Sequence, residues 1–383
     1  MRRKVLTIFG TRPEATKMAP VVQALRRRPE WFDVRVAVTG QHREQLDQVL
    51  AHFGIVPDHD LDIMQPRQTL SYIVTAALVG LEEVIRGERP DMVLVHGDTH
   101  TTLAGTLAAY YNQVPVGHVE AGLRTYNKYS PFPEEMNRRL TDAVADLLFA
   151  PTPANRENLL REGIDPSRIF VTGQTGVDAT LITYREDYRF HEPRLREVDF
   201  GRWRVVAVTA HRRENWGEPM RQMFTAMREL VETHPDVLLV YPVHLGPAVR
   251  EVAFPILSGH PRILLLDPID YPDMINLLAR SYLVLSDSGG LQEETPVFGR
   301  PLVLMRDTTE RPEAVAAGTV VLAGTSREAV YAHAHRLLSD AEAYAAMARA
   351  RNPFGDGRAS ERIAGILAHH FGLAPALPSE FAP

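Results

Sequence analysis

Six polar side chains stand where catalytic groups gather in parallel α/β proteins. Each follows an apolar segment of strand character within a few residues; these side chains are Arg12, Asp98, Glu120, His211, His244 and Ser288. The carboxyl ends of parallel strands line the ligand crevice of an open sheet, so the six are expected to face a ligand. Any one of them alone also fits a helix cap or a loop contact. Their number favours a ligand site.

Three carboxylates, Asp98, Glu120 and Glu134, together with these Arg and His residues suit acid–base chemistry. Other chemistries have no counterpart in the sequence. It contains no G-x-G-x-x-G, no Walker A segment and no Cys. We therefore expect no nicotinamide or other cofactor, no metal site and no thiolate chemistry.

Residues 283–294 (LVLSDSGGLQEE) predict a strand, a tight turn and a helix. Gly289 and Gly290 let the backbone approach a ligand closely, and the first N–H groups of the helix have no partner within it. A phosphate fits beside Ser288 at such a turn, and Glu294 is one helical turn further on, where a carboxylate can accept hydrogen bonds from ribose hydroxyls. The alternative is a plain connection in which Ser and Asp cap the helix.

Short apolar segments alternate with segments of helical periodicity along most of the chain, which predicts mostly parallel sheets covered by helices on both faces. The expected strands are residues 5–9, 34–39, 92–96, 114–119, 147–150 and 169–172, then 205–209, 237–241, 263–266, 283–286, 301–304 and 320–322. A mixed stretch without clean periodicity separates the two series. The fold class expected is α/β, with two doubly wound, Rossmann-like domains facing each other across a cleft.

The expected domains are residues 1–173, a second, nucleotide-binding domain of residues 174–355, and a last helix, residues 356–372, followed by a frayed tail, residues 373–383. The net charge of −6 argues against nucleic acid as a partner. No run of 18 apolar residues predicts a membrane span, and the first nine residues do not resemble a signal peptide. A cytoplasmic location is the expectation.

Seven segments, taken in order, closely resemble the non-hydrolysing UDP-N-acetylglucosamine 2-epimerases of bacteria. They are residues 9–17 (FGTRPEATK), 96–99 (HGDT), 117–124 (GHVEAGLR), 130–135 (SPFPEE), 211–214 (HRRE), 287–290 (DSGG) and 306–313 (RDTTERPE). The resemblance implies the two-domain fold of nucleotide-sugar glycosyltransferases, a last helix that returns to the N-terminal domain, and a homodimer.

The implied reaction interconverts UDP-N-acetylglucosamine and UDP-N-acetylmannosamine. The sugar C2–H is not next to a carbonyl, so the remaining route expels UDP from C1 as the C2 proton leaves, then adds UDP back with protonation of the other face. By resemblance, the catalytic residues are Asp98, Glu120, Glu134 and His211, and the substrate-binding residues are Arg12, Lys17, Ser288, Gly289, Gly290 and Glu294.

Some family members also bind a second UDP-N-acetylglucosamine as an activator. The matching positions here are Gln41, Arg67, Arg212 and His244. One position departs from the pattern, because Glu44 stands where some activator-binding members have Gln. A carboxylate there repels a nucleotide phosphate.

Three other functions remain open at this point. An epimerase of a more decorated sugar, such as a diacetamido uronic acid nucleotide, requires only a few different side chains at the site. A UDP-sugar-dependent glycosyltransferase uses the same fold but needs one catalytic base, whereas three carboxylates are matched here. A catalytically silent nucleotide-sugar sensor has no need of the carboxylates.

Overall fold

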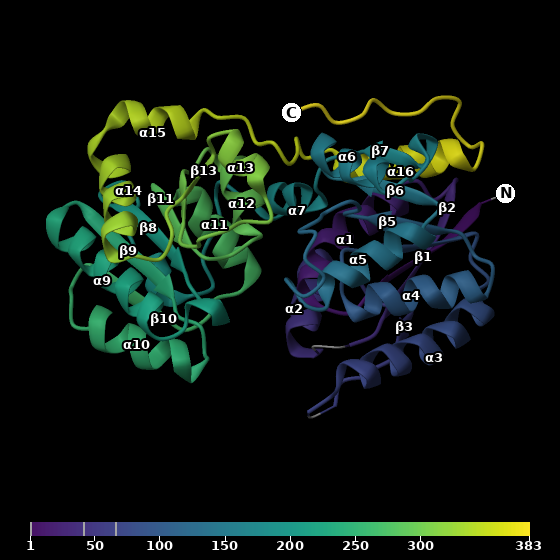
Figure 1. Ribbon diagram of the computed structural model, residues 1–383, viewed down its shortest axis with the longest axis horizontal. Coiled ribbons are helices and arrows are strands. Elements are labelled where there is room, and N and C mark those ends of the chain that lie inside the picture. The colour runs from purple at the N-terminus through teal and green to yellow at the C-terminus, as the bar shows by residue number, and fades with distance from the viewer. Residues whose placement is uncertain (1, 41–42, 66) are drawn as a thin grey trace. The chain divides into compact units, whose positions relative to one another are not determined.

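A computed structural model describes residues 2–40, 43–65 and 67–383 (Figure 1). The chain divides into two compact units, Met1–Ile182 with Phe354–Pro383 and Thr183–Pro353, called here the first and the second unit. The domain boundaries expected from the sequence stay predictions. Within the described residues, every helix is too short or too polar to cross a lipid bilayer.

The described residues of the first unit form a seven-stranded parallel sheet in the order β3-β2-β1-β4-β5-β6-β7. Its strands are β1 (Arg3–Phe9), β2 (Phe32–Val38), β3 (His59–Asp60), β4 (Met92–His96), β5 (Val116–Val119), β6 (Leu147–Ala150) and β7 (Ile169–Val171). Its helices are α1 (Arg12–Arg26), α2 (Arg43–Phe53), α3 (Leu70–Glu88), α4 (His100–Tyr111), α5 (Glu134–Val144), α6 (Pro153–Arg161), α7 (Thr175–Thr183) and α16 (Ala359–His370).

The described residues of the second unit form a six-stranded parallel sheet in the order β10-β9-β8-β11-β12-β13. Its strands are β8 (Arg204–Thr209), β9 (Val237–Pro242), β10 (Ile263–Leu266), β11 (Leu283–Ser286), β12 (Leu302–Leu304) and β13 (Val320–Leu322). Its helices are α8 (Pro193–Arg196), α9 (Glu218–Thr233), α10 (Pro247–Leu257), α11 (Tyr271–Arg280), α12 (Leu291–Glu294), α13 (Pro312–Ala316), α14 (Arg327–Ser339) and α15 (Ala341–Ala348). The expected α/β class is confirmed.

The strand order reverses once in each sheet, and these reversals are where doubly wound sheets bind ligands. In the first unit the chain runs from β1 to β2 and β3 on one side, and β4 then pairs with β1 on the other side. In the second unit the reversal lies between β8 and β11. The loops after β1, β4, β8 and β11 carry Arg12, Asp98, His211 and Ser288, so the predicted site residues follow the strands at both reversals.

The burial of β4 agrees with its place in the middle of the first sheet. All five residues of β4 are buried, and both faces of the sheet are covered by helices. Helix α16 belongs to the first unit, where Asp178 accepts hydrogen bonds from the backbone N–H groups of Ala359 (3.1 Å) and Ser360 (2.7 Å) that open the helix. A carboxylate at this helix end satisfies donors that have no partner within the helix.

The last residues differ from the expectation of a frayed tail. The N–H of Phe381 donates to the carbonyl oxygen of Val171 on edge strand β7 (2.8 Å), and Glu380 accepts from the N–H of Val171 (3.1 Å). The Phe381 side chain is buried, and the guanidinium of Arg362 lies over its ring. The tail therefore pairs with a strand whose edge is otherwise open.

Candidate functional site

Asp98 and Glu120 lie in neighbouring loops of the first unit, each directly after a buried strand. Asp98 follows β4, and Glu120 follows β5, which pairs with β4. Glu120 has φ 70°, in the left-handed region that non-glycine residues rarely adopt, and Gly97 has φ 68°. A Cβ placed on Gly97 would lie 3.6 Å from Glu120 Oε1, so the two loops are in contact. Backbone strain of this kind is concentrated at functional sites.

Glu120 is almost buried and is held by donors from two other elements. Its Oε2 atom accepts from the Nζ of Lys17 on α1 and from the Nε2 of Gln174, which follows β7. The ring Nε2 of His96 lies 3.7 Å from the same oxygen. The structure thus brings together Lys17 and Glu120, two residues that are 103 positions apart.

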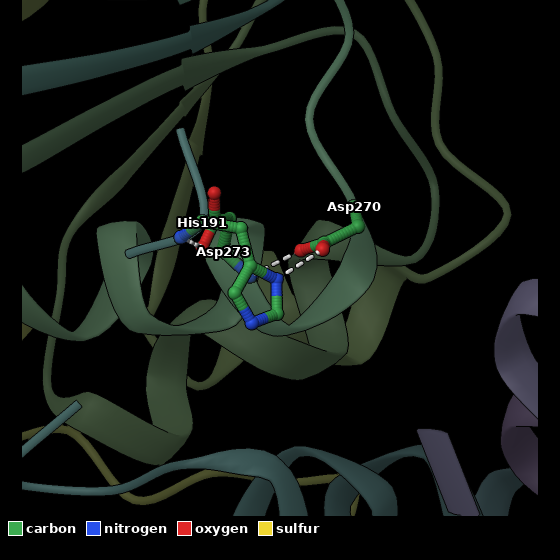
Figure 2. A group of neighbouring side chains, drawn as sticks. All are labelled: His191, Asp270 and Asp273. Atoms are coloured by element: carbon green, nitrogen blue, oxygen red, sulfur yellow. Dashed lines mark hydrogen bonds and ion pairs between the residues drawn. The ribbon is translucent and has the colours of Figure 1, made fainter. Parts of the chain in front are cut away.

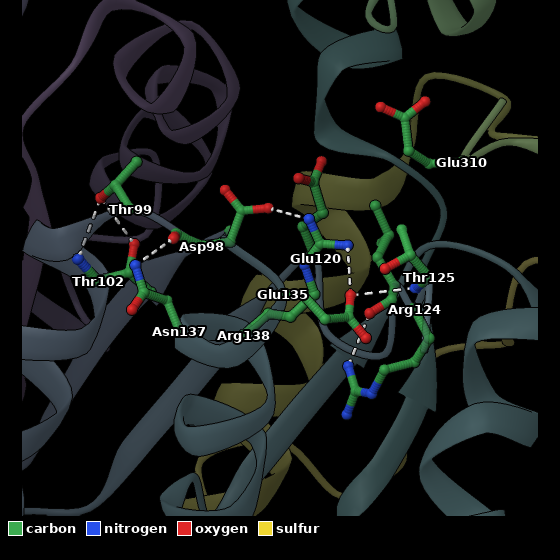
Figure 3. Close-up of polar contacts among 12 residues, drawn as sticks. Asp98, Thr99, Thr102, Glu120, Arg124, Thr125, Glu135, Asn137, Arg138 and Glu310 are labelled. Carbon is green, nitrogen blue, oxygen red and sulfur yellow. Dashed lines mark hydrogen bonds and ion pairs between the residues drawn. The ribbon is translucent and has the colours of Figure 1, made fainter. Parts of the chain in front are cut away.

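Asp98 is paired with Arg138, whose Nη2 donates to Asp98 Oδ2 at 2.5 Å (Figure 3). Asn137 Nδ2 donates to the Asp98 carbonyl oxygen at 2.9 Å. Both donors belong to α5, the helix that begins with Glu134, which is half-buried. Helix α5 therefore places the third predicted carboxylate on the element that holds Asp98.

Glu14 joins the loop after β1 to the loop after β4. Its Oε2 accepts from the N–H groups of Gly10 (3.0 Å) and Thr11 (2.8 Å), and its Oε1 accepts from Thr99 Oγ1 (2.7 Å). Burial raises the pKa of Glu14 above its usual value, although these hydrogen bonds act in the opposite direction. Arg12 is the exposed first residue of α1. The hydrogen bonds of Glu14 therefore hold the segment that carries Arg12 beside the loop that carries Asp98.

The second unit holds His211 and Arg212 by their backbone. The buried carboxylate of Asp287 accepts from the N–H groups of His211 (3.0 Å) and Arg212 (2.9 Å) and from Asn215 Nδ2 (3.2 Å). The His211 ring is stacked with that of His244, with centroids 6.0 Å apart and an angle of 22° between the rings. Asp287 follows β11, so one carboxylate joins the loops after β8 and β11.

Two guanidinium groups lie beside the glycines that follow Ser288. A Cβ placed on Gly289 would lie 2.8 Å from Arg311 Nη1 and 3.4 Å from Arg212 Nη2, whereas one placed on Gly290 would meet no atom within 4 Å. Arg311 Nε in turn donates to Glu293 Oε1 at 2.6 Å. Open backbone flanked by two cations is suited to a diphosphate. Glu294 ends α12 and is half-buried, as the ribose role requires.

The carboxylate of Glu310 connects Arg212 and Arg311 to a third cation, Arg306. Arg306 Nη1 donates to Glu310 Oε2 at 2.8 Å, and Arg212 Nη2 lies 3.8 Å from its Oε1. Burial alone would raise the pKa of Glu310, but Arg311 and Arg306 outweigh burial and hold it below its usual value. The loop of residues 306–313, to which the sequence assigned no single role, thus supplies charged partners to the turn after β11.

The predicted activator residues are placed in part. Arg67 is exposed, with φ 57°, and Arg212 and His244 lie in the second unit as described. Gln41 lies outside the described residues.

One group in the described part of the chain has the ligand types of a metal site: His191, Asp270 and Asp273 (Figure 2), with ligand atoms within 4.8 Å of one another. Asp273 accepts from the hydroxyl of Tyr188 and from the N–H groups of His191 and Glu192, each at 2.8 Å. Asp270 accepts from His191 Nδ1 at 2.5 Å and raises the pKa of that histidine. These hydrogen bonds attach residues 188–192 to α11, so we interpret the group as structural.

Sequence reasoning missed three residues of the site. Gln174 stands just after β7, where the strand-end argument would have found it. Arg138 stands four positions after Glu134 on α5, the spacing that places two side chains on one face of a helix. Arg311 lies within a segment already recognised as a motif.

Comparisons with known proteins agree with the motifs. The sequence profile of the family described as UDP-N-acetylglucosamine 2-epimerase matches residues 23–368. The UDP-N-acetylglucosamine 2-epimerase of Bacillus subtilis is 53% identical over 378 residues, covering 99% of this chain and 98% of the relative.

Two solved structures are similar over nearly the whole chain. The S. aureus structure, described as a co-structure with UDP, is 49% identical, with a TM-score of 0.90, and covers 99% of this chain and 100% of that one. The Neisseria meningitidis UDP-GlcNAc 2-epimerase, described as bound to UDP-GlcNAc, is 45% identical, with a TM-score of 0.89, and covers 96% and 100%.

Proposed function

Because this chain belongs to the UDP-N-acetylglucosamine 2-epimerase family, we propose that it interconverts UDP-N-acetylglucosamine and UDP-N-acetylmannosamine. It is an isomerase. The observation that carries the assignment of the site is the contact between the loops of Asp98 and Glu120 at the reversal of the first sheet, with Lys17 on Glu120. Acid–base groups and a cation are together there, as the reaction requires.

The proposed route is an elimination followed by an addition. A carboxylate removes the C2 proton, the C1–O bond breaks with its electron pair leaving on UDP, and a C1=C2 double bond forms in a 2-acetamidoglucal. UDP then re-forms the C1–O bond while a proton is delivered to the opposite face of C2. Atoms and electrons balance without an oxidant. One group must remove the proton from one face of C2 and another must deliver a proton to the opposite face, which explains why the site holds more than one carboxylate.

We assign proton transfer to Asp98, Glu120 and Glu134. Cationic side chains stabilise the negative charge on the departing diphosphate. Gly290 leaves room for the diphosphate, Arg212 and Arg311 beside Gly289 flank it, and Glu294 binds the ribose hydroxyls. His211, whose backbone is fixed by Asp287, donates to the leaving oxygen. The UDP named for the S. aureus relative is the ligand that such a seat would hold.

The test is incubation with UDP-N-acetylglucosamine in heavy water, followed at C2 by NMR. We expect UDP-N-acetylmannosamine with deuterium at C2. Asp98→Asn, Glu120→Gln and Glu134→Gln should each reduce the exchange by roughly 100-fold or more. Normal turnover with C2 hydrogen retained would contradict elimination, and turnover of only a diacetamido uronic acid nucleotide would assign a different sugar.

We further propose a cytoplasmic homodimer that pairs through the first unit. Large apolar side chains are exposed on three helices that lie side by side (Figure 1): Val79 on α3, Tyr110 and Tyr111 on α4, and Leu140 on α5. An exposed apolar patch of this kind is typical of an interface between subunits.

A further inference from the structure

His96 is the last residue of β4 and is buried beside the reacting carboxylates. Only 3% of its surface is exposed, and neither ring nitrogen has a hydrogen-bond partner. In the parallel register His96 lies opposite Val119, the residue before Glu120. Because buried polar atoms are nearly always paired, two unpaired ring nitrogens next to a functional carboxylate require an explanation.

The imidazole of His96 that faces Glu120 is neutral. Burial lowers the pKa of His96 to about 4; Glu120 and Asp98 act against this shift, and Lys17 and His118 act with it. At neutral pH the imidazole therefore carries one proton and one lone pair. The distance between its Nε2 and Glu120 Oε2 is 3.7 Å, so a small movement of either side chain would bring the two atoms within hydrogen-bond distance.

The position of His96 differs from that of Lys17, which holds the same carboxylate oxygen. The Lys17 ammonium stands on a flexible side chain and is expected among the substrate-binding residues, so an anionic substrate can compete with Glu120 for it. The imidazole of His96 is buried, neutral and attached to a central strand, so an anionic ligand does not draw it away from Glu120. It can therefore keep Glu120 oriented at the stage when Lys17 responds to the ligand.

We propose that His96, as a neutral imidazole with its proton on Nε2, donates to Glu120 Oε2 and positions this carboxylate for proton transfer at C2. The inference rests on the proposed function. His96 is a positioning residue, and it does not itself carry the proton.

The experiment compares His96→Gln, whose Nε2 keeps a donor near the same place, with His96→Leu, which fills the buried site without one. We expect His96→Leu to lose about 10- to 100-fold in kcat, with KM within about threefold, because a hydrogen bond to a charged group is lost. His96→Gln should recover most of that loss. His234→Leu, a matched change at a buried histidine of the second unit, should leave kcat unchanged.

The pH–rate profile separates positioning from proton transfer. Since His96 does not titrate near neutrality, the profile above about pH 5 should keep its shape in both variants. Loss of one limb of the profile, equal loss of kcat in His96→Gln and His96→Leu, or wild-type kcat in His96→Leu would each overturn the inference.

A second measurement does not depend on turnover. In ¹⁵N-histidine NMR of the whole protein, with the His96 signals identified by their loss in His96→Gln, the ring should be neutral with its proton on Nε2 from about pH 5.5 to 8. An imidazolium, or a ring protonated on Nδ1, contradicts the proposal. If the wild-type protein does not epimerise UDP-N-acetylglucosamine, the proposed function fails, and this spectrum still decides the state of His96.

Discussion

Asp142 Oδ1 lies 2.6 Å from His118 Nδ1, and the other ring nitrogen of His118 lies 2.8 Å from the carbonyl oxygen of Gly97. The two neighbours of the ring, a carboxylate and a carbonyl oxygen, come from different elements. Gly97 precedes Asp98, and His118 stands two positions before Glu120. This fully buried pair therefore joins the two loops that carry the proposed acid–base groups.

We predict that Asp142→Asn destabilises the first unit by about 3 kcal/mol, the usual effect of removing one partner of a buried ion pair. Burial alone would raise the pKa of Asp142, but His118 and Arg124 outweigh burial and hold it below its usual value. The stabilisation is therefore present above the unfolded-state pKa of about 3.9 and is lost as the pH falls through the folded-state pKa.

Urea denaturation followed by circular dichroism between about pH 3 and 7 measures this effect. The free energy of unfolding of the wild type should fall more steeply in acid than that of Asp142→Asn. Parallel curves for the two proteins would show that the pair contributes no pH-dependent stability.

Arg138→Met should lower kcat roughly 10- to 100-fold, because the guanidinium donates to Asp98 and this charged hydrogen bond is lost. Initial rates of epimerisation measure the change, and circular dichroism verifies the fold. Arg139→Met is the matched control on the same helix, since Arg139 faces Glu162 at 3.4 Å and is more exposed. Equal losses in the two variants would mean that α5, rather than the contact with Asp98, is disturbed.

Gly290→Ala should leave stability unchanged or raise it by up to about 1 kcal/mol, since φ is −63° and a Cβ meets no atom within 4 Å. The same Cβ would occupy the space assigned to the diphosphate, so the Kd for UDP should rise on the order of tenfold. Calorimetric titration with UDP measures it. Gly87→Ala, also in open space on α3, is the control; unchanged UDP affinity in Gly290→Ala would move the diphosphate elsewhere.

The sequence predicted the positions of the site residues because parallel strands end at one edge of a sheet. Asp98 and Glu120 were found from that rule alone, whereas the donors that hold them were not. Arg138 and Gln174 reach the carboxylates from elements far apart in the chain. Their local positions marked them as candidates, but which carboxylate each one contacts depends on the fold.

The missed elements have a similar cause. Helix α10 contains two prolines, Pro247 and Pro255, yet Val249, Ala253 and Leu257 recur every four residues and are all buried. The tail was expected to fray because its composition is that of a loop. Its order comes from pairing with β7, which is a long-range contact.

Tyr110→Glu should convert the proposed homodimer to a monomer, since a charge replaces an exposed aromatic ring on α4, the middle one of the three helices. Sedimentation velocity measures the mass. Tyr129→Glu, an equally exposed tyrosine outside the three helices, should leave the assembly unchanged. A wild-type monomer at micromolar concentration would contradict the dimer itself.

Activation by a second nucleotide sugar predicts a lag when UDP-N-acetylmannosamine is the only substrate, removed by a small amount of UDP-N-acetylglucosamine. We expect the exposed guanidinium of Arg67 to contact a phosphate of the activator, so Arg67→Ala should keep the lag at concentrations that abolish it in the wild type. Glu44→Gln removes a repelling charge and should lower the activating concentration. Arg89→Ala is a close control, because Arg89 is also exposed and has φ 49° against 57° for Arg67. Linear turnover of pure UDP-N-acetylmannosamine from the first seconds would show that no activator is required.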